Sequence, residues 1–229
     1  MRTAERRRGT WLRVAVLLLP AVAGCTAAGR DSGTRGREQD PAYHMQWALE
    51  RLNRGQYKEA LESIDRALEL KPDGYELHNL RGLILYTAGE PANALTEYRR
   101  TLELNNYFTD AHNNAGAALA SLGRPDEALA EFQLVLKDPR YPAREKVHVN
   151  MADVYAAESN WEEAVAEYRR ALVIKPDYVG AHFKLGKALL ELGRPGEARE
   201  AFAEVVRLQP HSDEAREVKQ LLAASPTSS

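Results

Sequence analysis

The sequence predicts an all-α fold, a right-handed superhelical solenoid of helical hairpins, from three observations. Alanines recur in similar contexts with spacings of 34, 34, 36 and 34 residues, at Ala60, Ala94, Ala128, Ala164 and Ala198. Small and bulky residues keep a constant distance from each alanine, and glycines fall between paired segments. A fixed period of this size is typical of stacked hairpins. Function is therefore expected on a surface rather than in a catalytic pocket.

Five units occupy residues 41 to about 211, and each begins with a helix that carries a small residue. These residues are Ala48, Gly82, Gly116, Ala152 and Gly186. The second helix carries the repeated alanine and, four residues later, a bulky residue: Ile64, Tyr98, Phe132, Tyr168 or Phe202. Small residues let two helices approach closely, and the bulky residue is expected to fill the gap against the neighbouring hairpin.

Glycine and proline mark the helix ends. The loop inside a hairpin needs a residue free to adopt positive φ, and this loop carries Gly55, Gly89, Gly123 and Gly193. Proline, which lacks an N–H, follows the second helix in units one, four and five, at Pro72, Pro176 and Pro210. A sixth, partial helix from about residue 212 to 223 is expected to cap the stack.

The small, alanine, bulky and proline positions of these units resemble the tetratricopeptide repeat. Asn106 and Arg140 stand where proline is expected, and two residues are inserted within 138–142. Because of this insertion, the sequence does not determine whether the pitch of the solenoid changes between units three and four. The resemblance implies a concave face, lined by the first helix of each hairpin, that binds other proteins.

The first 24 residues are interpreted as an export signal that is removed. An apolar stretch from Val14 to Val22 is too short to span a bilayer as a permanent helix. Val22-Ala23-Gly24-Cys25 then resembles the lipobox of bacterial lipoproteins, in which the signal is cut before the cysteine and the thiol carries a diacylglycerol. The alternative is a buried free cysteine in a helix. Cys25 is the only cysteine of the sequence and has no disulfide partner in it, which favours lipidation. Basic residues precede the stretch: Arg2, Arg6, Arg7, Arg8 and Arg13.

Residues 25–40 are expected to form the lipidated cysteine and a flexible tether, residues 41–224 the solenoid, and residues 225–229 a disordered tail. Fifteen flexible residues reach about 20 Å. Thr26 rather than Asp follows the cysteine, which by resemblance to enterobacterial sorting signals favours the outer membrane, with the protein facing the periplasm. Without the signal, the chain has 26 Lys and Arg and 32 Asp and Glu, which gives a net charge of −6. This acidic balance argues against nucleic acid as a partner.

Catalytic, zinc, redox and phosphate-loop motifs are absent from the sequence, so no enzyme, cofactor, metal or small-molecule substrate is expected. Equivalent residues of adjacent hairpins lie about 10 Å apart, whereas two histidines sharing a zinc must each approach it within about 2.1 Å. Histidines at one equivalent position in each of the five units are therefore too far apart to share one metal ion. The repeated histidine indicates a packing position, and the alternative is packing that depends on pH. The position is occupied by His44, His78, His112, His148 and His182.

The concave face is the predicted partner-binding groove, and its positions follow from the family resemblance. An apolar groove with a polar rim suits an amphipathic helix or extended segment of a partner. Alternatively, Met45 and Leu49 pack beneath the tether or an N-terminal cap. These two residues replace the Lys and Asn with which chaperone-tail repeats grip a carboxylate, so apolar contacts are expected. The groove residues are Met45, Leu49, Leu52, Asn79, Leu83, Tyr86, Asn113, Val149 and Phe183.

A lipobox followed by such repeats resembles the outer-membrane pilotins of type IV pilus systems, the PilF/PilW and Tgl group. The resemblance implies a protein partner, the pilus secretin, which the lipid carries to the outer membrane for assembly. It also implies a role in pilus biogenesis and in twitching or gliding motility. The alternative function is a general periplasmic scaffold or regulator of a cell-wall enzyme.

Overall fold

The computed structural model describes residue 36 and residues 38–224. Within this part all regular structure is α-helical, and consecutive helices pair into antiparallel hairpins, which confirms the predicted all-α solenoid. A last helix follows the fifth hairpin. The helices are α2 (Pro41–Asn53), α3 (Tyr57–Leu70), α4 (Tyr75–Thr87), α5 (Pro91–Leu104), α6 (Thr109–Ser121), α7 (Pro125–Leu136), α8 (Arg144–Ala157), α9 (Trp161–Ile174), α10 (Val179–Glu191), α11 (Pro195–Leu208) and α12 (Asp213–Ala224).

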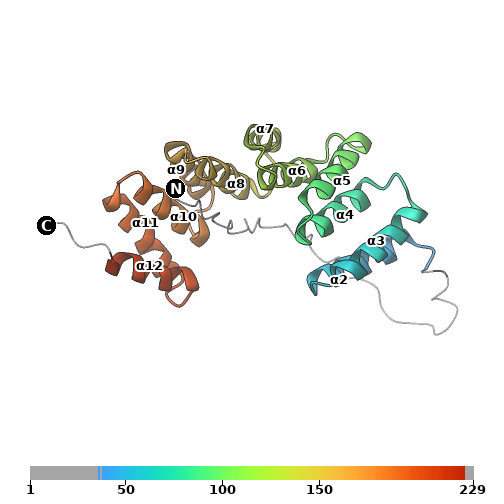
Figure 1. Cartoon of the computed structure of the whole chain (residues 1–229), viewed down its shortest axis with the longest axis horizontal. Helices are drawn as coiled ribbons and strands as arrows, with labels where there is room; N and C mark the ends of the chain where they lie inside the picture. The colour runs from blue at the N-terminus through green and yellow to red at the C-terminus, as the bar shows by residue number, and fades with distance from the viewer. Residues whose placement is uncertain (1–35, 37, 225–229) are drawn as a thin grey trace, which may run out of the picture.

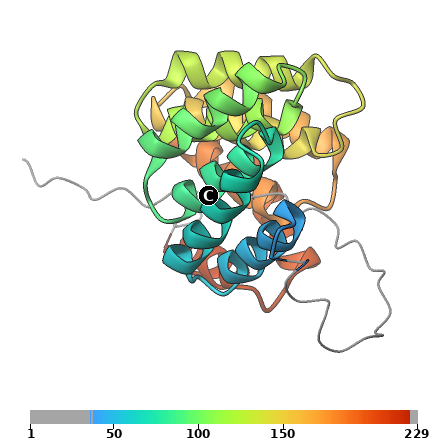
Figure 2. The same ribbon diagram turned by 90° about the vertical axis from the view of Figure 1, so that its right-hand side faces the viewer.

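The hairpins stack into an arch (Figure 1). The first helices α4, α6, α8 and α10 run along its inner side, and the second helices α5, α7 and α9 lie outside them. Figure 2, turned so that the N-terminal hairpin faces the viewer, shows the central hairpins above both ends. Buried apolar side chains form successive clusters over α2–α4, α4–α8 and α8–α12. Each hairpin thus completes the core of its neighbours, as in other repeat proteins.

Backbone constraints explain where the helices begin and end. Pro91, Pro125 and Pro195 each open a second helix, where a missing N–H costs nothing. The four predicted loop glycines adopt φ between 69° and 87°. The fourth hairpin lacks a glycine there, and Ser159 takes the same left-handed conformation at φ 60°. An L-residue is disfavoured in this conformation, so this turn carries strain that the other four avoid.

The small residue of the first helix lies against the bulky residue of the second helix in the same hairpin. A Cβ added to Gly82 would meet the Tyr98 ring at 2.6 Å, and one added to Gly186 would meet the Phe202 ring at 2.4 Å. The ring occupies the space left by its own hairpin's glycine, and it also belongs to a buried cluster that joins neighbouring hairpins. The small position and the bulky position of a repeat therefore form the two sides of one contact.

Replacing Gly116 by alanine is expected to destabilise the chain by about 1–3 kcal/mol, the usual cost of overpacking. The new Cβ would lie 2.7 Å from Phe132 Cε1, and that ring is buried on all sides. Urea unfolding followed by circular dichroism measures the change. Gly196→Ala is the matched control, because a Cβ there meets nothing within 4 Å. Equal stability losses in both variants would contradict this account of the small position.

The two-residue insertion lies in the connection between α7 and α8 and is tied to both neighbouring helices. Arg144 donates from Nη1 to the carbonyl oxygens of Leu136 and Asp138, at 2.8 and 2.9 Å, at the C-terminal end of α7. The hydroxyl of the buried Tyr141 donates to Asp110 Oδ1 at 2.9 Å. Burial and the Asp110 carboxylate raise the pKa of Tyr141 well above its ordinary value, so the phenol stays protonated. The insertion is accommodated in the loop without interrupting the stack.

The repeated histidine links the two helices of a hairpin through a glutamate 19 residues later. Nδ1 of His78, His112 and His148 lies 2.7, 2.6 and 2.7 Å from a carboxylate oxygen of the second helix. The position is therefore a polar contact as well as a packing position. The first and last hairpins have Ser63 and Ala201 in place of the glutamate. The partner carboxylates are those of Glu97, Glu131 and Glu167.

The His112–Glu131 contact is expected to make stability depend on pH. The hydrogen bond to Glu131 raises the pKa of His112 above its ordinary value, so its contribution is complete below the unfolded pKa of about 6.5. That contribution is lost as pH rises through the folded pKa. Glu131→Gln should therefore cost about 1 kcal/mol more at pH 5.5 than at pH 8.5.

Urea unfolding at both pH values measures this difference. Asp126→Asn is the control, because it removes one carboxylate from an exposed position of the same helix. Its cost should be the same at both pH values. A cost of Glu131→Gln that is likewise independent of pH would refute the prediction.

Candidate protein-binding surface on the inner face

The inner face of the arch is formed by α2, α4, α6, α8 and α10, which carry all nine predicted groove residues. The structure divides these residues by exposure. Leu52, Leu83, Asn113 and Val149 are buried within the stack and offer little surface to a partner. The side chains that remain partly exposed are those of Met45, Leu49, Asn79, Tyr86 and Phe183.

Hydrogen bonds join neighbouring first helices along this face. Asn114 Nδ2 donates to Asn79 Oδ1 at 3.1 Å between α6 and α4, and Tyr86 Oη lies 3.0 Å from Ser121 Oγ. Asn150 Nδ2 donates to Asn113 Oδ1 at 3.3 Å between α8 and α6. These side chains fix adjacent hairpins relative to one another. Asn114 and Ser121 were not among the predicted groove residues. Asn114 lies 35 residues after Asn79, and Ser121 lies 35 residues after Tyr86, which is one period of 34 plus one residue.

The N-terminal part of the face is apolar. Met45 and Leu49 pack partly buried against the cluster that contains Leu52 and Leu83. Their outer edges remain accessible, because both side chains are only partly buried. A partner that covers these edges gains hydrophobic stabilisation of about 25 cal/mol per Å² of apolar surface removed from water.

The C-terminal part of the face is charged. Lys184 Nζ of α10 binds Asp153 Oδ2 of α8, and Asp153 also accepts a hydrogen bond from Tyr168 at 2.6 Å. Lys187 Nζ lies 5.2 Å from the Phe183 ring centroid, within the range of a cation–π contact. Burial and the Asp153 carboxylate raise the pKa of Tyr168 well above its ordinary value, so its hydroxyl remains a donor. The face thus changes along the arch from apolar through amide-lined to charged.

This arrangement suits binding of an extended or helical segment. In the described part of the chain, no group of three or more His, Cys, Asp or Glu side chains could hold a metal ion. None of the described helices has the length and apolar character needed to cross a membrane. Cys25, the signal and residues 26–35 lie outside the described residues, as does the tail at 225–229.

Comparisons with known proteins agree with the repeat. Profiles described as tetratricopeptide repeat match residues 45–108, 92–144 and 179–212, and a profile described as TPR repeat matches residues 152–193. Protein O-mannosyl-transferase TMTC3 of Homo sapiens is 35% identical over 68 residues, which are 29% of this chain and 7% of that protein. The chain therefore spans a small part of that relative.

Two solved structures share the fold along most of their length. PilW, described as a widely conserved type IV pilus biogenesis factor, has a TM-score of 0.69 at 23% identity, covering 81% of this chain and 93% of PilW. PilF of Pseudomonas aeruginosa has a TM-score of 0.70 at 21% identity, covering 82% of this chain and 86% of PilF. At such identities the likeness establishes the fold alone. With the profiles spread over all five hairpins, the chain belongs to the tetratricopeptide-repeat family of protein-binding scaffolds.

Proposed function

We propose that this chain is a lipid-anchored pilotin, which binds the type IV pilus secretin through its inner face and promotes secretin assembly in the outer membrane. The observation that carries the proposal is the sequence Val22-Ala23-Gly24-Cys25 ahead of the repeats that begin at residue 41. A lipobox supplies the anchor and the repeats supply the binding surface. The fold shared with the pilus biogenesis factor PilW over 93% of its length supports a role in pilus biogenesis.

The anchor acts by raising the concentration of its cargo at the membrane. Each buried CH₂ of an acyl chain contributes about 0.8 kcal/mol to membrane binding, and two chains give stable anchoring. A subunit held on the inner face shares this membrane affinity through the tether, because the two binding events become intramolecular. Local enrichment of secretin subunits then favours their assembly into a ring.

The partner segment is one with apolar side chains toward the N-terminal hairpin and acidic or amide groups toward the C-terminal hairpin. Met45 and Leu49 would contact the first part, while Lys187 over Phe183 would meet the second. An amphipathic helix or an extended strand presents side chains at spacings that such a groove can accommodate.

A variant at the apolar end tests the surface. Met45→Glu places a charge against apolar side chains and is expected to reduce copurification of secretin with the full-length chain by about tenfold or more, as for an interface hot spot. Gln46→Glu is the matched control, because it adds the same charge at an exposed neighbouring position of α2. Circular dichroism confirms that both variants fold. Equal recovery of secretin with the two variants would remove the inner face from the proposal.

The second candidate function is a scaffold or regulator of a periplasmic cell-wall enzyme, which would use the same anchor and surface. The copurification distinguishes the two. A cell-wall synthase or hydrolase recovered with the wild-type chain in place of secretin, and lost in Met45→Glu, would favour this second function.

A further inference from the structure

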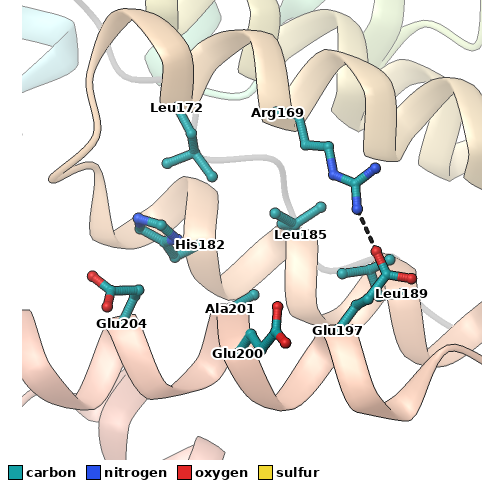
Figure 3. A pocket seen from close by; sticks show the side chains of 9 residues that line it. All are labelled: Arg169, Leu172, His182, Leu185, Leu189, Glu197, Glu200, Ala201 and Glu204. Atoms are coloured by element: carbon teal, nitrogen blue, oxygen red, sulfur yellow. Dashed lines mark hydrogen bonds and ion pairs between the residues drawn. The ribbon is translucent and has the colours of Figure 1, made fainter.

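A pocket of about 230 Å³ opens between α9, α10 and α11, in the last two hairpins (Figure 3). Its floor is apolar and its rim is charged. This volume is below the roughly 300–1,000 Å³ of small-molecule sites, so its size suits a single side chain. The floor is formed by Leu172, Leu185, Leu189 and Ala201, and the polar lining by Arg169, His182, Glu197, Glu200 and Glu204.

The pocket lies where the last hairpin departs from the repeat. In the second, third and fourth hairpins a glutamate 19 residues after the histidine extends its carboxylate to the imidazole Nδ1. In the fifth hairpin that position is Ala201, whose methyl group lines the pocket instead. The missing carboxylate accounts for the space and leaves the histidine without its usual partner.

In its neutral form, His182 has a hydrogen-bond acceptor that the contacts of the described residues leave unused. Its Nε2 lies 2.8 Å from the carbonyl oxygen of Pro176, which can only accept, so Nε2 carries the hydrogen. The other nitrogen of a neutral imidazole is an acceptor. Among the described residues Nδ1 of His182 has no hydrogen-bond partner. Figure 3 shows the ring between Leu172 and Glu204.

The rim is acidic. Glu197 is paired with Arg169 and Arg194, the latter at 2.6 Å. Glu200 makes no ion pair with any described residue, and Glu204 pairs only with Arg207. Of the three carboxylates that line the pocket, those of Glu197 and Glu204 are already balanced by arginines, so Glu200 is the one without an ion pair among the described residues. The unpaired carboxylate of Glu200 would repel an incoming carboxylate and attract an incoming cation.

We propose that this pocket receives a basic side chain, arginine or lysine, from an extended segment of a protein partner. The aliphatic stem of that side chain lies on Leu172, Leu185 and Ala201, and its charged head donates hydrogen bonds to His182 Nδ1 and the carboxylates of Glu200 and Glu204. Long basic side chains commonly bury their stems while the head stays polar. This docking surface is distinct from the inner face and does not depend on the secretin being the partner.

The test uses full-length chain purified in detergent and labelled at its leucine methyl groups. A capped pentapeptide with arginine between alanines is titrated in, and the methyl signals of Leu172, Leu185 and Leu189 report binding. Matched peptides carry norleucine or glutamate in place of arginine. We expect the arginine peptide alone to shift these three signals in a saturable way.

Ala201→Glu is the decisive variant, because it restores the carboxylate present in the second, third and fourth hairpins and refills the pocket. The variant should keep the fold, since Glu97, Glu131 and Glu167 occupy the same position, and it should abolish binding of the arginine peptide. Glu200→Gln keeps the pocket and is expected to weaken binding by about threefold, the effect of a partly exposed ion pair. It also keeps the proposal testable if Ala201→Glu fails to fold.

The outcomes separate the alternatives. Saturable shifts with the arginine peptide that disappear in Ala201→Glu and weaken in Glu200→Gln support the proposal. Shifts with the norleucine peptide as large as with arginine would indicate an apolar pocket and overturn it. Binding of the glutamate peptide instead would mean that the partner supplies the missing carboxylate, which also overturns it. No shift with any peptide at millimolar concentration would exclude a side-chain site here.

Discussion

Replacing Phe132 by alanine will lower the free energy of unfolding by about 3–5 kcal/mol, the usual cost of truncating a buried aromatic ring. Phe132 is 1% exposed and belongs to the central cluster that joins α4 to α8. Its ring also covers Gly116, so its removal opens a cavity at the closest approach of α6 and α7. Because hairpins stabilise one another in a solenoid, loss at the centre weakens both halves. Urea unfolding followed by circular dichroism measures the change.

Leu134→Ala is the control for this prediction, because it lies on the same helix with 39% of its surface exposed. Its expected cost is below about 1 kcal/mol. A similar cost for both variants would mean that the central hairpin is not held by the ring and glycine contact.

The proposed function predicts that replacing Cys25 by serine prevents acylation and association with the outer membrane. Serine has no thiol to carry the diacylglycerol, so the variant loses the membrane partitioning of about 10⁴ M⁻¹ that even one acyl chain provides. Metabolic labelling with radioactive palmitate, followed by separation of inner and outer membranes, measures both effects. Thr26→Ser is the control, because it changes the neighbouring residue and keeps the thiol. Palmitate incorporation that persists in Cys25→Ser would contradict the lipobox interpretation.

The repeat explains why so much of the fold could be predicted from sequence. Each hairpin is marked several times over, by a small residue, an alanine, a bulky residue and a helix-ending glycine or proline, and every mark recurs in most units. The fourth hairpin shows that the turn follows from this pattern even without glycine, since Ser159 adopts positive φ there. Packing of equivalent hairpins on both sides imposes the turn on this residue.

The partner of each bulky residue was less accessible to sequence reasoning. A ring at the end of one period can pack on its own hairpin or on the next, and the spacing allows both. The structure places Phe132 on Gly116 and Phe202 on Gly186. The glutamates opposite the histidines were missed for a related reason, because the histidine pattern alone does not show which residue of the second helix each imidazole faces.

The inner face could be located from sequence but its exposure could not. A residue such as Leu83 faces the concave side and also touches the preceding hairpin, and packing decides which contact dominates. In the structure Leu83 and Val149 are buried, whereas Met45 and Phe183 keep accessible edges. The pocket beside Ala201 depends on one substitution within the repeat, which is visible only when the last hairpin is aligned with the others.

The most direct test of the account is deletion of the gene in the native bacterium, followed by detergent fractionation and immunoblotting for heat-resistant secretin multimers in the outer membrane. We predict that the multimers disappear while secretin monomer remains, and that the wild-type chain restores them but Cys25→Ser does not. Multimers that persist unchanged in the deletion strain would contradict the assignment as a pilotin.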